Sequence, residues 1–483
     1  MLVQLTVALA VGAPVAAGQE SGAAAREPTS FHRDVRPILQ ASCLGCHQPA
    51  RAKGRLVLTT YDDLMKGGED GASVVPGKPD ESLLIELVTT PDDIPPEMPE
   101  EGDPLTPEAV DTIRRWIAEG AIDDTPESLA HPFTMERPPV YARPPVVSAL
   151  DFSPDGRLLA LSGFHEVLLH RADGSGLVGR LVGLSERIES VAFSPDGSRL
   201  AVAGGLPARM GELQVWDVRE RELRLSLPVT FDTIYGASWS PDGTVIAFGC
   251  ADNTLRAIDV ETGAEVLYQG AHADWVLDTA FSTDGSHLVS VGRDRTLKLT
   301  KVATQQFIDN ITSITPGALK GGLIAVDRHP TRDELLVGGA DGAPKVYRMY
   351  REKKRVIGDD YNLIRAYAAL PGRVFAVEWS PDGEHFIAGS SHAGTGEVRV
   401  YRASEEAPVW TFESPRPVYA VAFHLGGATV AAAGADGVVR LFAADDGRLL
   451  REFAAAPLEG STRTGSDGRD AVADANTNEH EDS

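Results

Sequence analysis

The chain has 483 residues, which is too long for one compact core, so at least two domains are expected. Its formal net charge is −25, and this excess of acidic groups argues against nucleic acid or an anionic membrane surface as the main partner. Three cysteines, two of them in one short motif, are too few for a secreted fold stabilised by disulfides. The third, Cys250, is expected to be a buried strand residue.

Residues 2–17 form an apolar run that ends in small residues, which predicts a signal peptide over residues 1–17 and a periplasmic or otherwise exported protein. No Lys or Arg precedes this run. An uncleaved anchor is the alternative, although the run is shorter than the ~20 residues that a membrane helix needs. No other segment is apolar enough to cross a bilayer, so no integral membrane span is expected.

The first domain is expected over residues 30–121 and carries the motif Cys43-Leu44-Gly45-Cys46-His47 after a short helix at Phe31–Gln40. Two thiols at this spacing can add to the two vinyl groups of one haem, while the adjacent His presents a ring nitrogen to the iron. The alternatives are a thioredoxin-like disulfide, which usually lies in a βαβ context, or half of a zinc site, which needs a second pair of ligands.

A haem that only carries electrons needs a second axial ligand, and Met98 is the candidate. It lies in a Pro-rich loop over residues 94–102, ahead of a predicted helix from Thr106 to Glu119. The other candidates are Met65, Met135 and His32. Residues 61–103 hold 13 acidic and 2 basic side chains, which predicts either a docking rim for a basic redox partner or a solvated acidic face.

Several stretches between residues 30 and 121 resemble the planctomycete-type cytochrome c family: 34–39, 66–69, 75–84, 105–108 and 113–117. Met98-Pro99-Glu100 stands where that family usually has Met-Pro-Pro. The resemblance implies a small all-α domain with one covalent haem c, held by Cys43, Cys46, His47 and Met98, that transfers electrons. It implies no established substrate.

After a Pro-rich linker over residues 122–145, the sequence repeats itself. Phe-Ser-Pro-Asp-Gly or a close variant recurs at 152–156, 193–197, 239–243, 281–285 and 379–383, with degenerate copies at 329–331 and 424–427. Seven copies at this spacing match four-stranded blades, and Pro-Asp-Gly suits the turn between two strands. Residues 146–454 therefore resemble WD-repeat propellers of seven blades, in which His272 would bond to Asp294 to brace a blade. The polar tail, 455–483, is expected to be disordered.

The fold class predicted from these features is a small all-α cytochrome c domain followed by an all-β, seven-bladed propeller. The favoured function is an exported mono-haem electron carrier whose propeller is a docking platform for another protein. The alternative is a redox enzyme or a haem-based sensor whose propeller has a site of its own. Residues 146–454 show no clustered His or carboxylate motif, which favours a carrier over a catalyst.

Overall fold

The computed structural model describes residues 27–44, 46–48, 51–89, 95–100, 103–125, 133–207, 210–230, 232–270, 272–313, 320–356 and 358–459. The predicted signal peptide lies outside the described residues, as do residues 126–132 of the linker and 460–483 of the tail. No helix in the described part of the chain is both long enough and apolar enough to span a bilayer.

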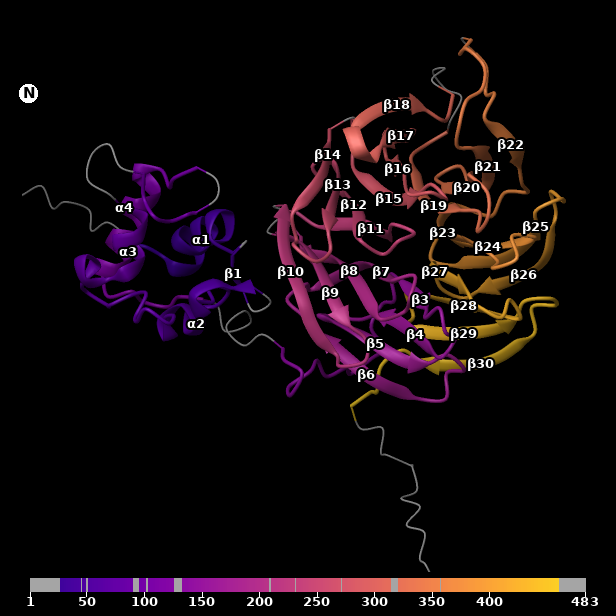
Figure 1. Ribbon diagram of the computed structural model, residues 1–483. Helices are drawn as coiled ribbons and strands as arrows, with labels where there is room; N and C mark the ends of the chain where they lie inside the picture. Colours follow the sequence, from indigo (N-terminus) through magenta and orange to yellow (C-terminus); the bar gives the residue numbers. More distant parts are fainter. Residues whose placement is uncertain are drawn as a thin grey trace, which may run out of the picture.

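The N-terminal domain consists of short helices connected by loops (Figure 1). Its elements are η1 (Phe31–Val35), α1 (Arg36–Ser42), β1 (His47–Gln48), β2 (Arg51–Ala52), η2 (Lys53–Arg55), α2 (Tyr61–Lys66), η3 (Pro79–Glu81), α3 (Leu83–Val88) and α4 (Pro107–Ala118). α4 begins where the sequence predicts, because Thr106 caps it by accepting a hydrogen bond from the Ala109 N–H and Pro107 needs no such partner. Ile113, Trp116 and Ile117 on its apolar face are fully buried, and Trp116 packs against Phe31 with ring centroids 5.2 Å apart.

The remaining chain forms seven antiparallel four-stranded sheets within the described residues, which confirms the predicted seven-bladed propeller (Figure 1). Blade 1 consists of β3 (Leu150–Phe152), β4 (Leu158–Ser162), β5 (Glu166–Arg171) and β6 (Leu177–Val182). Blade 2 consists of β7 (Arg187–Phe193), β8 (Arg199–Leu206), β9 (Met210–Asp217) and β10 (Glu222–Thr230). Blade 3 consists of β11 (Ile234–Trp239), β12 (Val245–Cys250), β13 (Leu255–Asp259) and β14 (Glu265–Gln269). Blade 4 consists of β15 (Val276–Phe281), β16 (His287–Gly292), β17 (Leu297–Lys301) and β18 (Gln306–Asn310). Blade 5 consists of β19 (Leu323–Arg328), β20 (Glu334–Gly339), β21 (Lys345–Arg348) and β22 (Leu363–Ala366). Blade 6 consists of β23 (Arg373–Trp379), β24 (His385–Ser391), β25 (Gly396–Arg402) and β26 (Pro408–Ser414). Blade 7 consists of β27 (Val418–Phe423), β28 (Thr429–Gly434), β29 (Val438–Ala443) and β30 (Leu449–Ala454).

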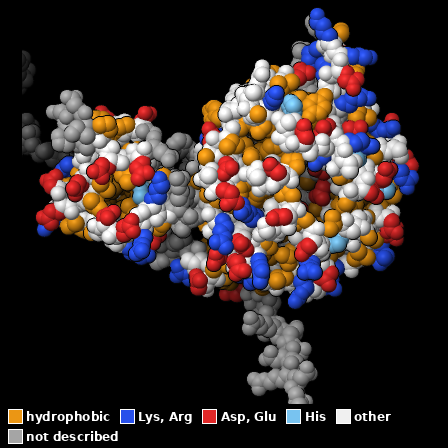
Figure 2. Space-filling model, in the orientation of Figure 1, with side chains coloured by type: hydrophobic (Ala, Val, Ile, Leu, Met, Phe, Trp, Pro, Cys, Tyr) orange, Lys and Arg blue, Asp and Glu red, His pale blue; other side chains and the backbone are white. Residues whose placement is uncertain are grey.

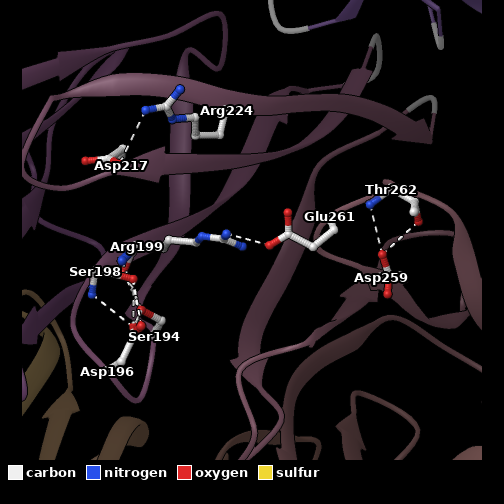
Figure 3. A network of polar contacts seen from close by, with 9 residues as sticks. All are labelled: Ser194, Asp196, Ser198, Arg199, Asp217, Arg224, Asp259, Glu261 and Thr262. Carbon is white, nitrogen blue, oxygen red and sulfur yellow. Dashed lines mark hydrogen bonds and ion pairs between the residues drawn. The ribbon is translucent and has the colours of Figure 1, made fainter.

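The repeated Ser-Pro-Asp-Gly forms the turn between the first two strands of a blade. In blade 2, the Ser194 hydroxyl donates to Asp196 (2.6 Å; Figure 3). Gly197 takes the positive φ of 71° that the turn requires. Arg199, just after this turn, forms an ion pair with Glu261 of blade 3. The turn therefore closes each hairpin and places side chains where they contact the next blade.

Two further expectations about the propeller are confirmed. His272 bonds through Nδ1 to Asp294 (3.0 Å) and through Nε2 to the Ser290 hydroxyl (2.8 Å), so it braces blade 4. Cys250 is fully buried at the end of β12.

The ring closes between β27 of blade 7 and β3 of blade 1, where the backbone N–H of Val147 donates to the Gly434 carbonyl (3.0 Å). The seam is also bridged by His424, whose Nε2 lies 2.9 Å from the Gly156 carbonyl oxygen. The innermost strands of consecutive blades contact one another around the whole ring.

Segments on both sides of the predicted propeller pack onto it, so its contacts extend beyond 146–454. Tyr141 is buried and pairs with Leu458, and the Glu459 N–H donates to the Tyr141 carbonyl (2.8 Å). Ala455 is fully buried, and its carbonyl accepts from His170 (2.7 Å). Residues 455–459 are thus ordered, contrary to the expected disorder, because small apolar side chains and backbone groups here find partners in blades 1 and 7.

Carboxyl groups on the innermost strands connect four pairs of neighbouring blades, with one carboxyl group for each pair. Each accepts a hydrogen bond from the backbone N–H of the next blade, at 2.7 to 3.0 Å: Asp151 from Phe193, Asp278 from Val326, Asp327 from Trp379 and Glu378 from Phe423. The signal was present in the repeats, because Asp151, Asp327 and Glu378 each lie two residues before the repeat's Ser or its substitute.

Candidate functional site

The two motif cysteines follow the end of α1. The N–H groups of Cys46 and His47 both donate to the Cys43 carbonyl, at 3.2 and 3.1 Å, so the motif forms a compact turn. Both thiols are free and only partly buried. Burial, together with the nearby Cys46, raises the pKa of Cys43 to about 11, so this thiol is protonated at neutral pH.

The His47 ring is oriented by the backbone that follows it. Its Nδ1 lies 3.1 Å from the Lys53 carbonyl oxygen, and β1 pairs with β2 so that this oxygen is held in place. Burial lowers the pKa of His47, against hydrogen bonds to the Lys53 and Leu56 carbonyls that raise it. A neutral ring that donates from Nδ1 keeps its lone pair on Nε2, which is the arrangement common to metal-binding histidines.

Met98 packs against the same hydrophobic core as Cys43, and its backbone N–H donates to the Leu87 carbonyl of α3 (3.0 Å). Two residues further on, Glu100 forms an ion pair with Lys53 (2.8 Å). Lys53 also supplies the carbonyl that orients His47, so the loop of Met98 is connected to the segment of His47. Nothing in the sequence signalled this pair, since its members are 47 residues apart.

The competing candidates occupy other positions. Met65 lies in α2 and also packs against the core. Its helix is connected to the His47 segment as well, through the Leu58 N–H that donates to the His47 carbonyl (2.9 Å) and the Glu69 N–H that donates to the Gly54 carbonyl (2.8 Å). Met135 lies beside the propeller, where its sulfur accepts from the Val182 N–H (3.4 Å). His32 lies in η1, with its Nδ1 3.4 Å from an Arg36 guanidinium nitrogen.

The side chains assembled here fit a haem c. Cys43 and Met98 pack against one apolar core, whose partly buried members also include Ile38, Leu56, Leu105 and Val110. Cys46 and His47 follow Cys43 in the compact turn described above. Among the described residues, no group of three or more His, Cys, Asp or Glu side chains is arranged to hold a metal ion.

Exposed carboxylates lie close to Met98 in sequence and on α3, the helix that its backbone contacts. We define the Met98 rim as Glu86, Glu97, Glu100 and Asp103, all of them exposed or half-exposed. Glu100 is paired with Lys53, whereas no ion pair is formed by Glu86, Glu97 or Asp103 within the described residues. Asp92, Asp93 and Glu101 of the predicted acidic stretch lie outside the described residues.

Comparison with known families agrees with this division. Residues 43–102 match the family model described as Planctomycete cytochrome C. Residues 208–319 match the Anaphase-promoting complex subunit 4 WD40 domain, and residues 406–442 match the WD domain, G-beta repeat. The chain joins a planctomycete-type cytochrome c domain to a WD-repeat propeller.

Curated relatives of this cytochrome–propeller protein include proteins named for their WD repeats. It is 24% identical over 286 residues to WD repeat-containing protein 26 homolog of Arabidopsis thaliana, covering 52% of this chain and 48% of that protein. It is 30% identical over 109 residues to WD repeat-containing protein 91 homolog of Dictyostelium discoideum, covering 22% of this chain and 14% of that protein. It is 27% identical over 252 residues to Coronin-7 of Mus musculus, covering 48% of this chain and 26% of that protein. The chain thus spans less than half the length of each of these relatives.

Proposed function

We propose that the N-terminal domain binds one haem c, attached covalently through Cys43 and Cys46 and ligated by His47 and Met98, and that the protein transfers single electrons outside the cytoplasm. The observation that carries this proposal is the connection from His47 through Lys53 and Glu100 to the loop of Met98, because it joins the segments of the two proposed ligands. The apolar run over residues 2–17 supports export.

The bound haem would supply a one-electron couple, and the chain's own residues determine how that couple is held. The Lys53 carbonyl fixes the ring of His47, and the hydrogen bond to Leu87 fixes the backbone of Met98. The apolar core around Cys43 excludes water, while the Met98 rim presents negative charge that attracts a basic redox partner. The propeller is the protein-docking part of the molecule.

The attachment site is tested by replacing both motif cysteines. The Cys43→Ala/Cys46→Ala variant should retain no haem after denaturation, whereas Cys250→Ala, which removes the propeller cysteine, should retain all of it. The propeller of the double variant should keep its β-rich circular dichroism, because its blades make none of their described contacts with the motif. Haem that stays covalently bound to the double variant would contradict the assignment.

A further inference from the structure

A group of basic side chains projects from blade 5 of this otherwise acidic protein. We define the basic projection as residues 348–356, which are the last residue of β21 and the first part of its connection to β22. It carries Arg348, Arg351, Lys353, Lys354 and Arg355, against a single acid, Glu352. Figure 2 shows blue side chains gathered at the top of the propeller, where Figure 1 draws this connection.

Two of these bases anchor the projection. Arg355 bonds to Asp309 of β18 (2.9 Å), and Arg351 bonds to Asp359 (3.0 Å) and lies 3.6 Å from Asp309. The ring of Tyr361 is close to three cations, at 5.4 Å from Arg351 and Lys353 and 5.9 Å from Arg348. The projection is therefore held by blade 4 as well as by its own chain.

The other side of the projection faces solvent. Lys353 and Lys354 are exposed, and they are flanked by the exposed apolar residues Tyr350 (37% exposed) and Val356 (65%). Phe307 and Ile308 on the neighbouring edge strand β18 are exposed as well. Cations beside apolar side chains form a surface that fits an acidic protein patch with an apolar centre.

This chain carries an acidic patch in its Met98 rim, whose exposed carboxylates lie around the half-buried Met98. We propose that the basic projection of one molecule binds the Met98 rim of a second copy. The inference rests on the proposed function for the identity of the rim, and it specifies the basic partner that the rim attracts.

The path of the chain favours a second copy over contact within one molecule. The cytochrome domain is attached to blade 1, where Met135 contacts Val182, and blade 5 lies on the opposite side of the ring. Ten residues from Thr125 to Met135 span at most about 35 Å. Two four-stranded sheets on opposite sides of the ring measure about 30 Å without the space between them. The linker alone therefore covers little more than the width of the ring, whereas a second copy can bring its rim to the projection without this limit.

The contact joins two different surfaces, so it is heterologous and can continue from copy to copy. We expect concentration-dependent association of the full-length haem-loaded protein at about 50 mM salt that disappears at about 500 mM, because exposed charges are screened over a short Debye length. Sedimentation velocity measures how association depends on protein concentration and on salt concentration. A monomer at every concentration in low salt would overturn the proposal.

Charge reversal locates the two surfaces. K353E/K354E and E97K/D103K should each weaken association by at least about tenfold, and an equimolar mixture of the two variants should restore it. R157E/R219E is the matched control for K353E/K354E, because it makes the same change of charge on exposed residues of blades 1 and 2, and it should associate like the wild type. Failure of the mixture to associate would overturn the proposal. So would a larger monomer radius in E97K/D103K with no change in association, which would indicate docking within one chain.

The haem spectrum separates this proposal from the proposed function. If the haem-loaded protein keeps its spectrum but never associates, only the further inference fails. If the Cys43→Ala/Cys46→Ala variant still retains covalent haem while the wild type associates, only the proposed attachment site fails.

Discussion

Met98 and Met65 both pack against the core of the cytochrome domain, and they differ in local structure, because Met98 lies in a Pro-rich loop and Met65 in a helix. The loop of Met98 is connected to the His47 segment by the Lys53–Glu100 ion pair, whereas Met65 lies within α2. A thioether is a soft, neutral ligand that favours Fe(II), so Met/His ligation raises the reduction potential. The identity of the ligand should therefore be visible in the redox behaviour.

Replacing Met98 with Ala should lower the reduction potential, abolish the methionine–iron charge-transfer band and allow the reduced protein to bind carbon monoxide. Each follows from losing the thioether and opening a position at the iron. Potentiometry and visible spectroscopy measure these effects. Met65→Ala is the matched control and should change none of them; if it loses the band while Met98→Ala keeps it, the ligand assignment is wrong.

At the scale of single residues, the sequence predicts the haem-binding side chains better than the contacts that hold them in place. The spacing of Cys43, Cys46 and His47 is a local pattern, so it can be read directly. The Lys53–Glu100 pair and the hydrogen bond from Met98 to Leu87 depend on how loops fold back, which no local pattern encodes. The carboxylates Asp151, Asp327 and Glu378 were readable in the repeats, yet only the closed ring brings their blades together.

Secondary structure follows the local sequence closely. Pro at the start of α4 and Asp-Gly in the blade turns restrict the backbone within a few residues, so these elements are predictable. The segment over residues 139–147, by contrast, has a Pro-rich composition typical of a linker. Arg180 donates to the Pro139 carbonyl (2.6 Å), and Tyr141 donates to the buried Glu166 (2.7 Å), so its order comes from partners distant in sequence.

The packed residues 455–459 should contribute measurably to stability. A chain that ends at Ala454 loses the hydrogen bonds that His170, Gly437 and Tyr141 make to this segment. Its free energy of unfolding should therefore be lower by about 2–4 kcal/mol. A chain that ends at Glu459 is the control and should melt like the full-length protein. Equal thermal midpoints for the two truncated proteins would show that the segment is dispensable.

At the scale of the whole molecule, the carboxyl groups that connect the blades couple the ring to pH. Burial raises the pKa of Asp151 and of Asp278 to about 7, and that of Asp327 to about 6; it also raises the pKa of Glu378 well above its ordinary value. Ordinary carboxyl groups in an unfolded chain titrate near pH 4. The folded ring therefore holds more protons than the unfolded chain between about pH 4 and 7, so these groups lower the free energy of unfolding as pH rises through that window.

Asp327→Asn tests this coupling. The amide oxygen can still accept from the Trp379 N–H but carries no charge, so the thermal midpoint of the variant relative to the wild type should be higher at pH 8 than at pH 5 by a few degrees. The comparison is made at each pH because burial lowers the pKa of His170, which has the opposite effect on stability. A difference between the two proteins that is independent of pH would contradict the prediction.

The order of contacts along residues 135–147 determines how a mechanical load would reach the propeller. From its N-terminal end, this segment contacts Val182, then Arg180, then Glu166, and only afterwards, at Val147, the seam between blades 1 and 7. A force on the cytochrome domain, such as drag from a bound partner, would peel these contacts one at a time. The contacts with Val182, Arg180 and Glu166 of blade 1 would break first, and the seam between blades 1 and 7 would open last.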